Sequence, residues 1–278
     1  MLSLESLLLP TSVLCLMASG FGVIIGSFLN VYIYRFHTGK SLSGSSHCLS
    51  CGTRLKWFEL FPLFSYLFLK GKCRTCGCKI PARYFLVELT TAILFALTIT
   101  LTTDAIAILF YWLILSVLLV ITVYDLYHFI IPDELTAVAI ALMTGLISYE
   151  YYLGIMNPHD ILITVLAALA GSAFFLFLWV ISKGAWLGFG DVKLAFPLGL
   201  LVGATKIFSF VVLSFWIGAA ISLLIMGFLK MRRGKQSLHL EGRALTMKSA
   251  IPFAPFLVAS SLVILFTQFD VLHLFSFI

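Results

Sequence analysis

Residues 161–182 read ILITVLAALAGSAFFLFLWVIS, a run made mostly of Leu, Ile, Val, Phe and Ala. A helix needs about 20 mostly apolar residues to cross the hydrocarbon core of a bilayer, and this run is long enough. The whole chain has the same character: 61% of its 278 residues are hydrophobic, 11% are charged, and the mean hydropathy is +1.09. Because a soluble domain of this size needs far more polar surface, the composition predicts an all-α polytopic membrane protein.

Six other runs have a similar length, and a shorter one, 193–205, lies between two of them. The shorter run contains Pro197, and we include it because its long neighbours leave it no other place. The first run is expected to be a permanent helix, since no Lys or Arg precedes Arg35 and the run is too long for a signal peptide. The sequence thus predicts eight transmembrane helices, at residues 11–34, 84–102, 106–124, 134–153, 161–182, 193–205, 207–229 and 250–272.

The basic residues orient these helices. Nine of the 18 Lys and Arg residues lie between Arg35 and Arg83, and six lie between Lys230 and Lys248. The positive-inside rule places both segments in the cytoplasm, and eight spans with an outer N-terminus satisfy it, whereas seven do not. The net charge of +6 therefore reflects membrane orientation, and we expect the lipid bilayer as a partner and no nucleic acid.

The polar residues and five of the six cysteines concentrate in one segment. We therefore divide the chain into a first transmembrane helix (1–34), a small cytoplasmic cysteine module (35–83) and a transmembrane core (84–278). The module lies between the first two transmembrane helices, and we expect it to resemble a zinc ribbon.

Two Cys-x2-Cys pairs define this module: Cys48 with Cys51, and Cys73 with Cys76. Each pair brings two thiolates within reach of one tetrahedral ion, and Gly52 and Gly77 follow the pairs, where a tight turn is needed. The alternatives are two disulfides, which a reducing cytoplasm disfavours, or a redox motif. We predict structural zinc on these four cysteines, with Cys78 and His47 as spare ligands.

Three acidic residues remain unexplained by loops or helix ends: Glu88, Asp125 and Asp191. On the eight-span topology, Asp125 and Asp191 both lie at the cytoplasmic ends of their helices, at similar depth. Ionisable groups within spans are costly and are functional candidates by default. Glu88 is either an interface residue or part of a pocket, and the sequence does not decide.

Two neighbouring carboxyl groups that share a proton can activate water and polarise a carbonyl, as an aspartic protease does, without a metal. The alternative is that Asp125 and Asp191 are separate helix caps. Gly188 and Gly190 are expected to allow a tight turn and close approach of an extended substrate. Asp133 is interpreted as a helix cap, and Lys193 has no assigned role.

Several motifs together resemble the bacterial prepilin peptidases, the polytopic GxGD-type aspartic peptidases of type IV pilus, type II secretion and competence systems. They occur in the family's order, from about residue 20 to 260: GSFLNVYIYR (26–35), LFLKGKCRTCG (67–77), RYFLVELTTA (83–92), DLYHFIIPD (125–133), GFGDVKL (188–194) and IPFAPFL (251–257).

This resemblance implies that Asp125 and Asp191 are the catalytic pair. It also implies a multi-pass enzyme of the bacterial inner membrane that cuts the basic leader of prepilins or pseudopilins on the cytoplasmic side, after Gly and before a Phe-like residue. The cysteine module implies a second activity, N-methylation of the new amino terminus with S-adenosylmethionine. The module departs from the family pattern at Ser46, Phe61 and the additional Cys78.

Three other functions compete with this interpretation. A protease of the presenilin and signal-peptide-peptidase kind shares the Tyr-Asp and GFGD elements, but the cysteine module and IPFAPFL argue against it. A proton-coupled transporter would use Asp125 and Asp191 as a midplane relay, and topology and the lack of a visible inverted repeat speak against it. A membrane scaffold with a docking zinc ribbon would leave both aspartates unexplained.

Overall fold

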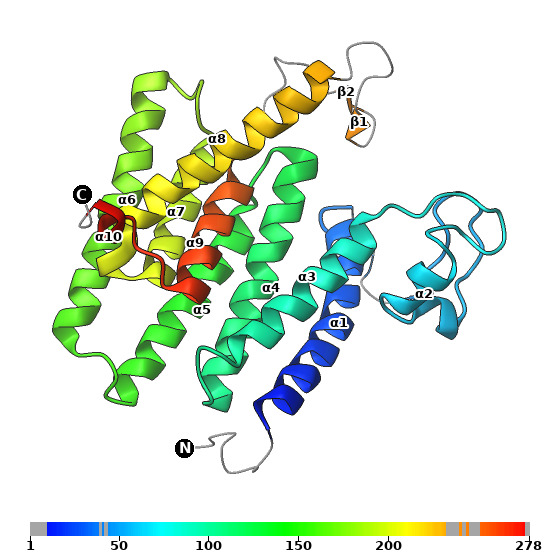
Figure 1. Ribbon diagram of the computed structural model, residues 1–278, viewed down its shortest axis with the longest axis horizontal. Coiled ribbons are helices and arrows are strands. Elements are labelled where there is room, and N and C mark those ends of the chain that lie inside the picture. The colour runs from blue at the N-terminus through cyan, green and yellow to red at the C-terminus, as the bar shows by residue number, and fades with distance from the viewer. Residues whose placement is uncertain are drawn as a thin grey trace. The chain divides into compact units, whose positions relative to one another are not determined.

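The structure, a computed structural model, describes residues 10–38, 41, 44–231, 239–240, 243–244 and 251–275. These residues are helical apart from loops, two isolated bridges and a ribbon of β1 (His239–Leu240) with β2 (Arg243–Ala244). The helices, drawn in Figure 1, are α1 (Thr11–Arg35), η2 (Trp57–Leu60), α2 (Phe64–Phe68), α3 (Arg83–Thr98), α4 (Ala105–His128), α5 (Asp133–Tyr152), α6 (Pro158–Ser182), α7 (Phe189–Val202), η3 (Ala204–Lys206), α8 (Ile207–Met231), α9 (Ala254–Thr267) and α10 (Val271–Phe275).

Each of the eight predicted spans falls on one of these helices, which confirms the all-α membrane class. Among the described residues, five helices are long and apolar enough to cross a membrane: α1, α4, α5, α6 and the continuous η3–α8. The other three, α3, α7 and α9, have 16, 14 and 14 residues. At about 1.5 Å per residue they are shorter than the roughly 30 Å hydrocarbon core, so the total of eight spans stays a prediction. The basic segment 230–249 lies mostly outside the described residues.

The chain divides into two compact units. The N-terminal unit, Met1–Val120, contains α1, α3, the cysteine module and most of α4. The C-terminal unit, Ile121–Ile278, contains the end of α4 and helices α5 to α10.

Close packing of α1 against α3 holds the N-terminal unit together. Gly22 and Gly26 of α1 face α3, where a Cβ on Gly22 would lie 2.8 Å from Ala92 Cα and one on Gly26 would lie 2.7 Å from Glu88 Cα. Without driving force from water, membrane helices associate through such small residues, which let the two backbones approach. The Gly-x3-Gly spacing therefore brings α3, and Glu88 with it, directly against α1.

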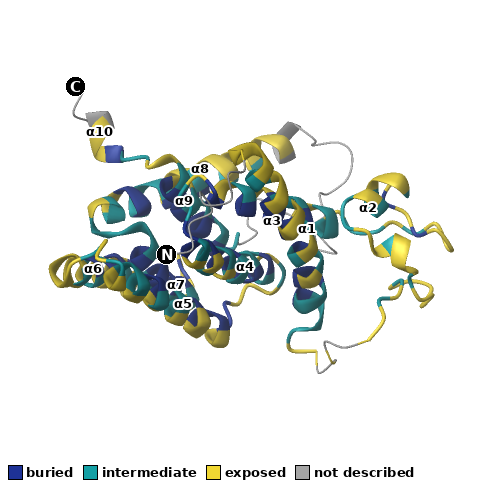
Figure 2. Cartoon of the chain, turned by 90° about the horizontal axis from the view of Figure 1, so that it is seen from below, coloured by how far each residue is buried: buried dark blue, intermediate teal, exposed yellow. Residues whose placement is uncertain are grey.

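Helix α7 is the core of the C-terminal unit, where it packs against α5, α6 and α9. Its residues Leu194, Ala195 and Leu198 are completely buried, and Figure 2 shows the buried residues gathered around α7 while exposed residues lie on the outer face of α6. A short helix with Pro197 inside it is tolerated here because protein rather than lipid surrounds it. The run that looked weakest as a span is thus the centre of this unit.

A group of phenylalanine rings fixes the start of α9. Phe253, directly before α9, lies 5.4 Å from Phe215 between ring centroids, and Phe215 stacks on Phe175 at 5.9 Å. Such aromatic pairs add to the free energy of burial. The rings anchor the IPFAPFL segment, and they hold the first backbone amides of α9 in place.

Candidate active site and cysteine cluster

Asp125 lies in the last turn of α4 and is buried, with 5% of its surface exposed. Its carboxylate forms a hydrogen bond with the backbone N–H of Ala254, the first residue of α9. The first amides of a helix have no partner within the helix, and they carry the positive end of its dipole. The IPFAPFL segment therefore supplies a donor to Asp125, a role that the sequence reasoning missed and that only the motif itself signalled.

Asp191 lies in the first turn of α7 and is equally buried, at 6% exposed. Its Oδ2 accepts a hydrogen bond from the Gly188 N–H at 3.0 Å, so the carboxylate caps α7. The same carboxyl group is close enough to Asp125 for the two charges to repel each other. The capping and the pairing interpretations are thus compatible, and the two aspartates meet within one unit.

The two glycines before Asp191 do not provide the expected tight turn. Gly188 has φ −74° and ψ 149°, an extended conformation open to any residue, and Gly190 lies within α7. A Cβ on Gly190 would lie 3.0 Å from the Cβ of Ile131, closer than ordinary contact. Gly190 is therefore explained by the packing of Ile131 against the start of α7.

Lys193, which has no role assigned from the sequence, forms an ion pair with Asp133, which the sequence predicts to be a helix cap. Lys193 Nζ lies 2.8 Å from Asp133 Oδ1, and it also lies over the ring of Phe189 at 5.1 Å. Asp133 is the first residue of α5, the cap position is Pro132, and no side-chain cap hydrogen bond forms. The capping role predicted for Asp133 is therefore wrong, because its carboxylate reaches across to α7 instead.

Glu88 on α3 is buried, with 8% of its surface exposed. Its Oε2 accepts a hydrogen bond from the backbone N–H of Leu63 at 2.8 Å, and Ser27 and Asn30 of α1 also bond to the carboxyl group. Of the two roles left open for Glu88, the structure supports the pocket, since this residue lines a cavity of the N-terminal unit.

The cysteine module is built from two similar turns. The Cys48 N–H donates to the Thr53 carbonyl at 2.9 Å, and the Cys73 N–H donates to the Cys78 carbonyl at 2.8 Å. Gly52 and Gly77 occupy the matching positions with φ of 69° and 70°, the left-handed region where glycine is favoured. The expectation that these glycines support tight turns is confirmed. Cys78 stands in the second turn where Thr53 stands in the first.

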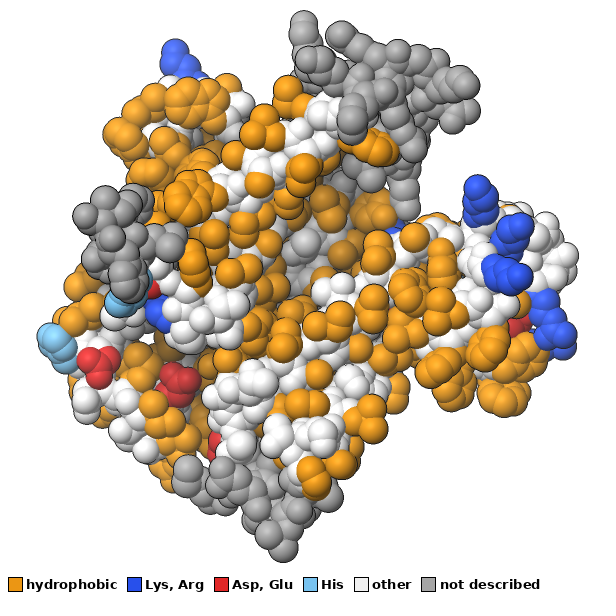
Figure 3. All heavy atoms as spheres, viewed as in Figure 1, with side chains coloured by type: hydrophobic (Ala, Val, Ile, Leu, Met, Phe, Trp, Pro, Cys, Tyr) orange, Lys and Arg blue, Asp and Glu red, His pale blue; other side chains and the backbone are white. Residues whose placement is uncertain are grey.

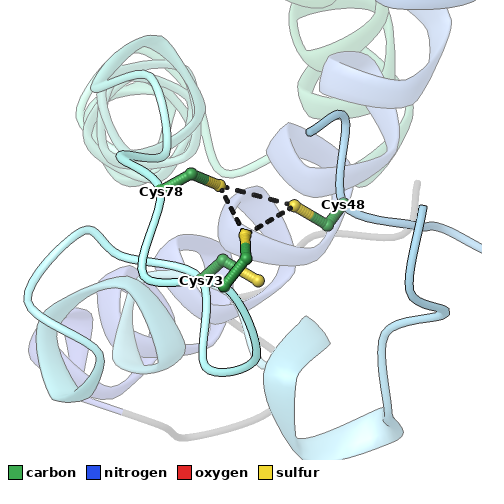
Figure 4. A group of neighbouring side chains, drawn as sticks. Cys48, Cys73 and Cys78 are labelled. Atoms are coloured by element: carbon green, nitrogen blue, oxygen red, sulfur yellow. Dashed lines mark hydrogen bonds between the residues drawn. The ribbon is translucent and has the colours of Figure 1, made fainter. Parts of the chain in front are cut away.

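Four sulfur atoms meet between these turns: those of Cys48, Cys73, Cys76 and Cys78 lie within 4.8 Å of one another. The Cys48 and Cys78 sulfurs point toward each other at 3.5 Å, as Figure 4 shows, and the Cys76 and Cys78 sulfurs are 3.1 Å apart. Four thiolates at about 2.3 Å from a tetrahedral zinc ion are roughly 3.8 Å apart. The cluster therefore fits zinc, and it gathers the sulfurs at one point rather than in two separate pairs.

Cys51, a predicted ligand, lies at the edge of this group. Its Sγ is 3.3 Å from Thr53 Oγ1, and hydrogen bonds with Thr53 lower the pKa of the Cys51 thiol to about 6. Hydrogen bonds with Ser50 and Cys76 also lower the pKa of the Cys78 thiol. Both thiols thus favour the thiolate form that binds metal, and the identity of the fourth ligand stays a prediction.

Among the described residues, five helices are long and apolar enough to cross a membrane, and two buried carboxyl groups interact. These features define the class: a polytopic membrane protein with an interacting aspartate pair. Two family profiles match the chain. The Bacterial Peptidase A24 N-terminal domain covers residues 21–102, and the Type IV leader peptidase family covers residues 112–223. No solved structure matches the chain significantly.

Among curated relatives, the chain is 35% identical over 209 residues to the type 4 prepilin-like proteins leader peptide-processing enzyme of Escherichia coli O78:H11, covering 66% of this chain and 74% of that one. It is 30% identical over 268 residues to the prepilin leader peptidase/N-methyltransferase of Dichelobacter nodosus, covering 85% and 86%. The enzyme of the same name from Aeromonas salmonicida is 29% identical over 270 residues, covering 85% of each chain. The chain therefore belongs to the type IV leader peptidase family of bacterial prepilin peptidases, as its motifs predicted. These matches do not support the presenilin-like or the transporter alternative.

Proposed function

We propose that the chain removes the leader of type IV prepilins or pseudopilins, with Asp125 and Asp191 as its catalytic pair. One observation carries this proposal: both carboxyl groups are buried, belong to one unit and interact electrostatically. Like charges at short range do not both ionise easily, so the pair holds one proton between its members.

This shared proton provides both halves of a peptide hydrolysis. The ionised carboxylate accepts a proton from water, which attacks the scissile carbonyl carbon while the protonated carboxyl group donates a hydrogen bond to the carbonyl oxygen. Collapse of the tetrahedral intermediate then needs a proton on the leaving amine, which the first carboxyl group now holds. The Ala254 and Gly188 amides orient the two carboxylates during these steps.

Family membership and the positive-inside rule support the location and the substrate. The proposal places the pair at the cytoplasmic side of the bacterial inner membrane, where the short basic leader of a prepilin is accessible. The leader is expected to be cut after Gly and before a Phe-like residue. Asp125 ends α4 and Asp191 begins α7, so both lie at helix ends rather than at the middle of a span.

Methylation is the second proposed activity, because curated relatives that match most of the chain are named prepilin leader peptidase/N-methyltransferase. S-adenosylmethionine would supply the methyl group for the amino terminus that cleavage exposes. The cysteine cluster would hold a structural zinc ion, since four protein ligands leave no open position for water.

The experiment that tests the proposal is mass spectrometry of a prepilin incubated with the purified protein and S-adenosylmethionine. Loss of the leader and gain of a methyl group appear separately in one spectrum. The Asp125→Asn and Asp191→Asn variants should lose cleavage while still inserting into membranes. Asp160→Asn is the matched control, because Asp160 is exposed and its contacts are with neighbours in the sequence: the Asn157 N–H at 3.2 Å and His159 Nδ1 at 4.0 Å. An intact prepilin after incubation with the wild-type protein would overturn the proposal.

A further inference from the structure

The N-terminal unit contains a cavity of about 510 Å³ between α1, α3 and the cysteine module. Its lining combines an amide, a carboxylate and aromatic rings: Asn30, Glu88, Tyr66, Tyr84 and Phe85. Sites for small molecules have volumes of about 300–1,000 Å³ and pair apolar walls with a few polar groups. The cavity therefore has the size and the chemistry of a small-molecule site, and neither Asp125 nor Asp191 is among its lining residues.

Asn30 is the unusual residue of this cavity. It is 3% exposed, and its Nδ2 donates a hydrogen bond to the Tyr84 carbonyl at 2.9 Å. Within the described part of the chain, no donor reaches its Oδ1. Buried acceptors without a donor are rare in folded proteins, and each one needs an explanation. A ligand that donates an N–H provides it.

Glu88 indicates the charge of that ligand. Its carboxyl group is hydrogen-bonded with the Asn30 side chain, so a carboxylate and an amide with an unmet oxygen are neighbours in the lining of the cavity. An ammonium group satisfies both at once, because it is cationic and carries three N–H donors.

Aromatic rings also contribute to the lining of the cavity. Tyr66 and Phe85 lie 5.4 Å apart between ring centroids, and Tyr84 also contributes to the wall. Bases of nucleosides stack on such rings, with little dependence on the identity of the base. The lining thus suits a ligand with an ammonium group and a flat heterocycle.

We propose that this cavity is the binding site for S-adenosylmethionine, with its α-ammonium group on Asn30 Oδ1 and Glu88 and its adenine among the aromatic rings. The inference rests on the proposed methyltransferase function. The sulfonium group has no hydrogen to donate, and the adenine amino group and ribose hydroxyls are neutral donors, so only the ammonium combines a donor for Asn30 with a positive charge for Glu88. A nucleoside without the methionine part lacks this anchor, whereas S-adenosylhomocysteine keeps it.

Isothermal titration of the full-length protein in nanodiscs, without any prepilin, tests this site. Asn30→Ala and Glu88→Gln should each weaken the binding of S-adenosylmethionine and of S-adenosylhomocysteine by at least about tenfold. The factor should be the same for the two ligands, because both ligands carry the ammonium group. Adenosine, which lacks it, should bind weakly and equally to the wild type and the variants. Val31→Trp fills the cavity without altering the Asn30–Glu88 bonds, and it should also abolish binding.

Glu134→Gln, at an exposed acid of the C-terminal unit, is the matched control and should bind like the wild type. Zinc content, measured on each variant, verifies that the module remains folded. The proposed site would be overturned if Val31→Trp bound S-adenosylmethionine as tightly as the wild type does. It would also be overturned if the wild type bound neither S-adenosylmethionine nor S-adenosylhomocysteine. Because no prepilin is present, neither outcome depends on whether Asp125 and Asp191 perform cleavage.

An independent observation concerns the outer surface of the module. Five aromatic residues of η2 and α2 and the loop between them are exposed, and we name them the aromatic ridge: Trp57 (76%), Phe58 (38%), Phe61 (56%), Phe64 (57%) and Phe68 (83%). Arg74 lies over the ring of Phe58 at 5.3 Å. The other exposed basic residues within a few positions of the ridge in the sequence are Arg54, Lys56, Lys70 and Lys72. Figure 3 shows hydrophobic and basic side chains together over this part of the unit.

We infer that the aromatic ridge inserts into the headgroup region of the bilayer and anchors the module there. The two helices of the ridge have four and five residues, far too few to cross a membrane, so the ridge suits the surface of a bilayer and not its interior. Aromatic residues prefer the membrane interface, and nearby Lys and Arg residues are attracted to anionic lipid headgroups. This combination of residues fits a lipid surface better than a protein groove.

The fluorescence of Trp57, taken as the difference between the wild type and Trp57→Phe, tests the anchor. In nanodiscs, lipids brominated near the headgroup should quench this signal strongly, and replacing anionic by zwitterionic lipids should reduce the quenching. Phe64→Glu with Phe68→Glu should expose Trp57 to iodide instead. No quenching by brominated lipid, or quenching that a prepilin competes away, would overturn the anchor in favour of solvent or of a protein partner.

Discussion

The two units each bury carboxyl groups, but in different settings. Glu88 of the N-terminal unit is 8% exposed and is surrounded by hydrogen-bond donors from Leu63, Ser27 and Asn30. Asp125 and Asp191 of the C-terminal unit are 5% and 6% exposed, and each bonds with a backbone amide but also faces the other's charge. Burial is thus nearly equal, and the difference lies in the neighbours. Hydrogen-bond donors hold a carboxylate in place. A second carboxyl group nearby instead causes the pair to retain one proton, which the pair can exchange with a substrate.

The most severe test of this difference is to remove one member of the pair. Asp125→Asn or Asp191→Asn should lower the rate of leader cleavage by about 10²–10⁴-fold, because each half of the reaction needs one of the two groups. The double variant should be no slower than the worse single one, since residues that act as a unit are not additive. Rates from a gel assay with purified prepilin check both points. If either single variant cleaves at the rate of Asp160→Asn, the two aspartates are separate helix caps.

The second prediction concerns the zinc ion expected in the N-terminal unit, which the peptidase pair does not need. Cys73→Ser should reduce the zinc content from about one ion per chain to almost none, because Cys73 is the buried member of the cluster. Comparison of Cys51→Ser with Cys78→Ser identifies the fourth ligand, and the sulfur geometry predicts the larger loss for Cys78→Ser. Elemental analysis of the purified variants measures this. Equal zinc in Cys73→Ser and the wild type would contradict a metal site in this module.

A smaller effect, on the free energy of unfolding, is expected when Glu88 is replaced. Glu88→Leu leaves the Leu63 N–H buried without an acceptor, which should lower the free energy of unfolding by about 1–3 kcal/mol. Glu88→Gln keeps an oxygen at this position and should recover most of that loss. Thermal unfolding in detergent compares the two variants. A Glu88→Leu protein as stable as Glu88→Gln would mean that the hydrogen bond with Leu63 contributes nothing.

The smallest effect is expected for Lys193, although it lies two residues from Asp191. Its ion pair with Asp133 joins side chains that are 38% and 73% exposed, and water screens such pairs, so Lys193→Met should cost at most about 1 kcal/mol. Cleavage assays and thermal unfolding test this together. A large loss of cleavage with unchanged stability would move Lys193 from a structural to a catalytic role.

Much of the fold and of the site could be read from the sequence. All eight apolar runs are helices, the two aspartates meet in one unit, and Gly52 and Gly77 make the turns expected of them. What failed was local detail: Asp133 does not cap its helix, and Gly190 is explained by Ile131 rather than by a tight turn. These details depend on residues that are distant in the chain, and no periodicity or motif spacing reports such contacts.

The amino-acid sequence by itself determined the membrane class, the helices and the residue types that carry chemistry. The reason is that an apolar run of this length must satisfy its own backbone in lipid, and a helix does so without help from the rest of the chain. Only the tertiary structure decided that the α9 amide of Ala254 reaches Asp125, that Cys78 joins the sulfur cluster and that Asn30 keeps an unmet oxygen in a cavity. Each of these results from packing between separate helices or turns, because contacts across a fold are made by side-chain shape and not by the local pattern that forms each element.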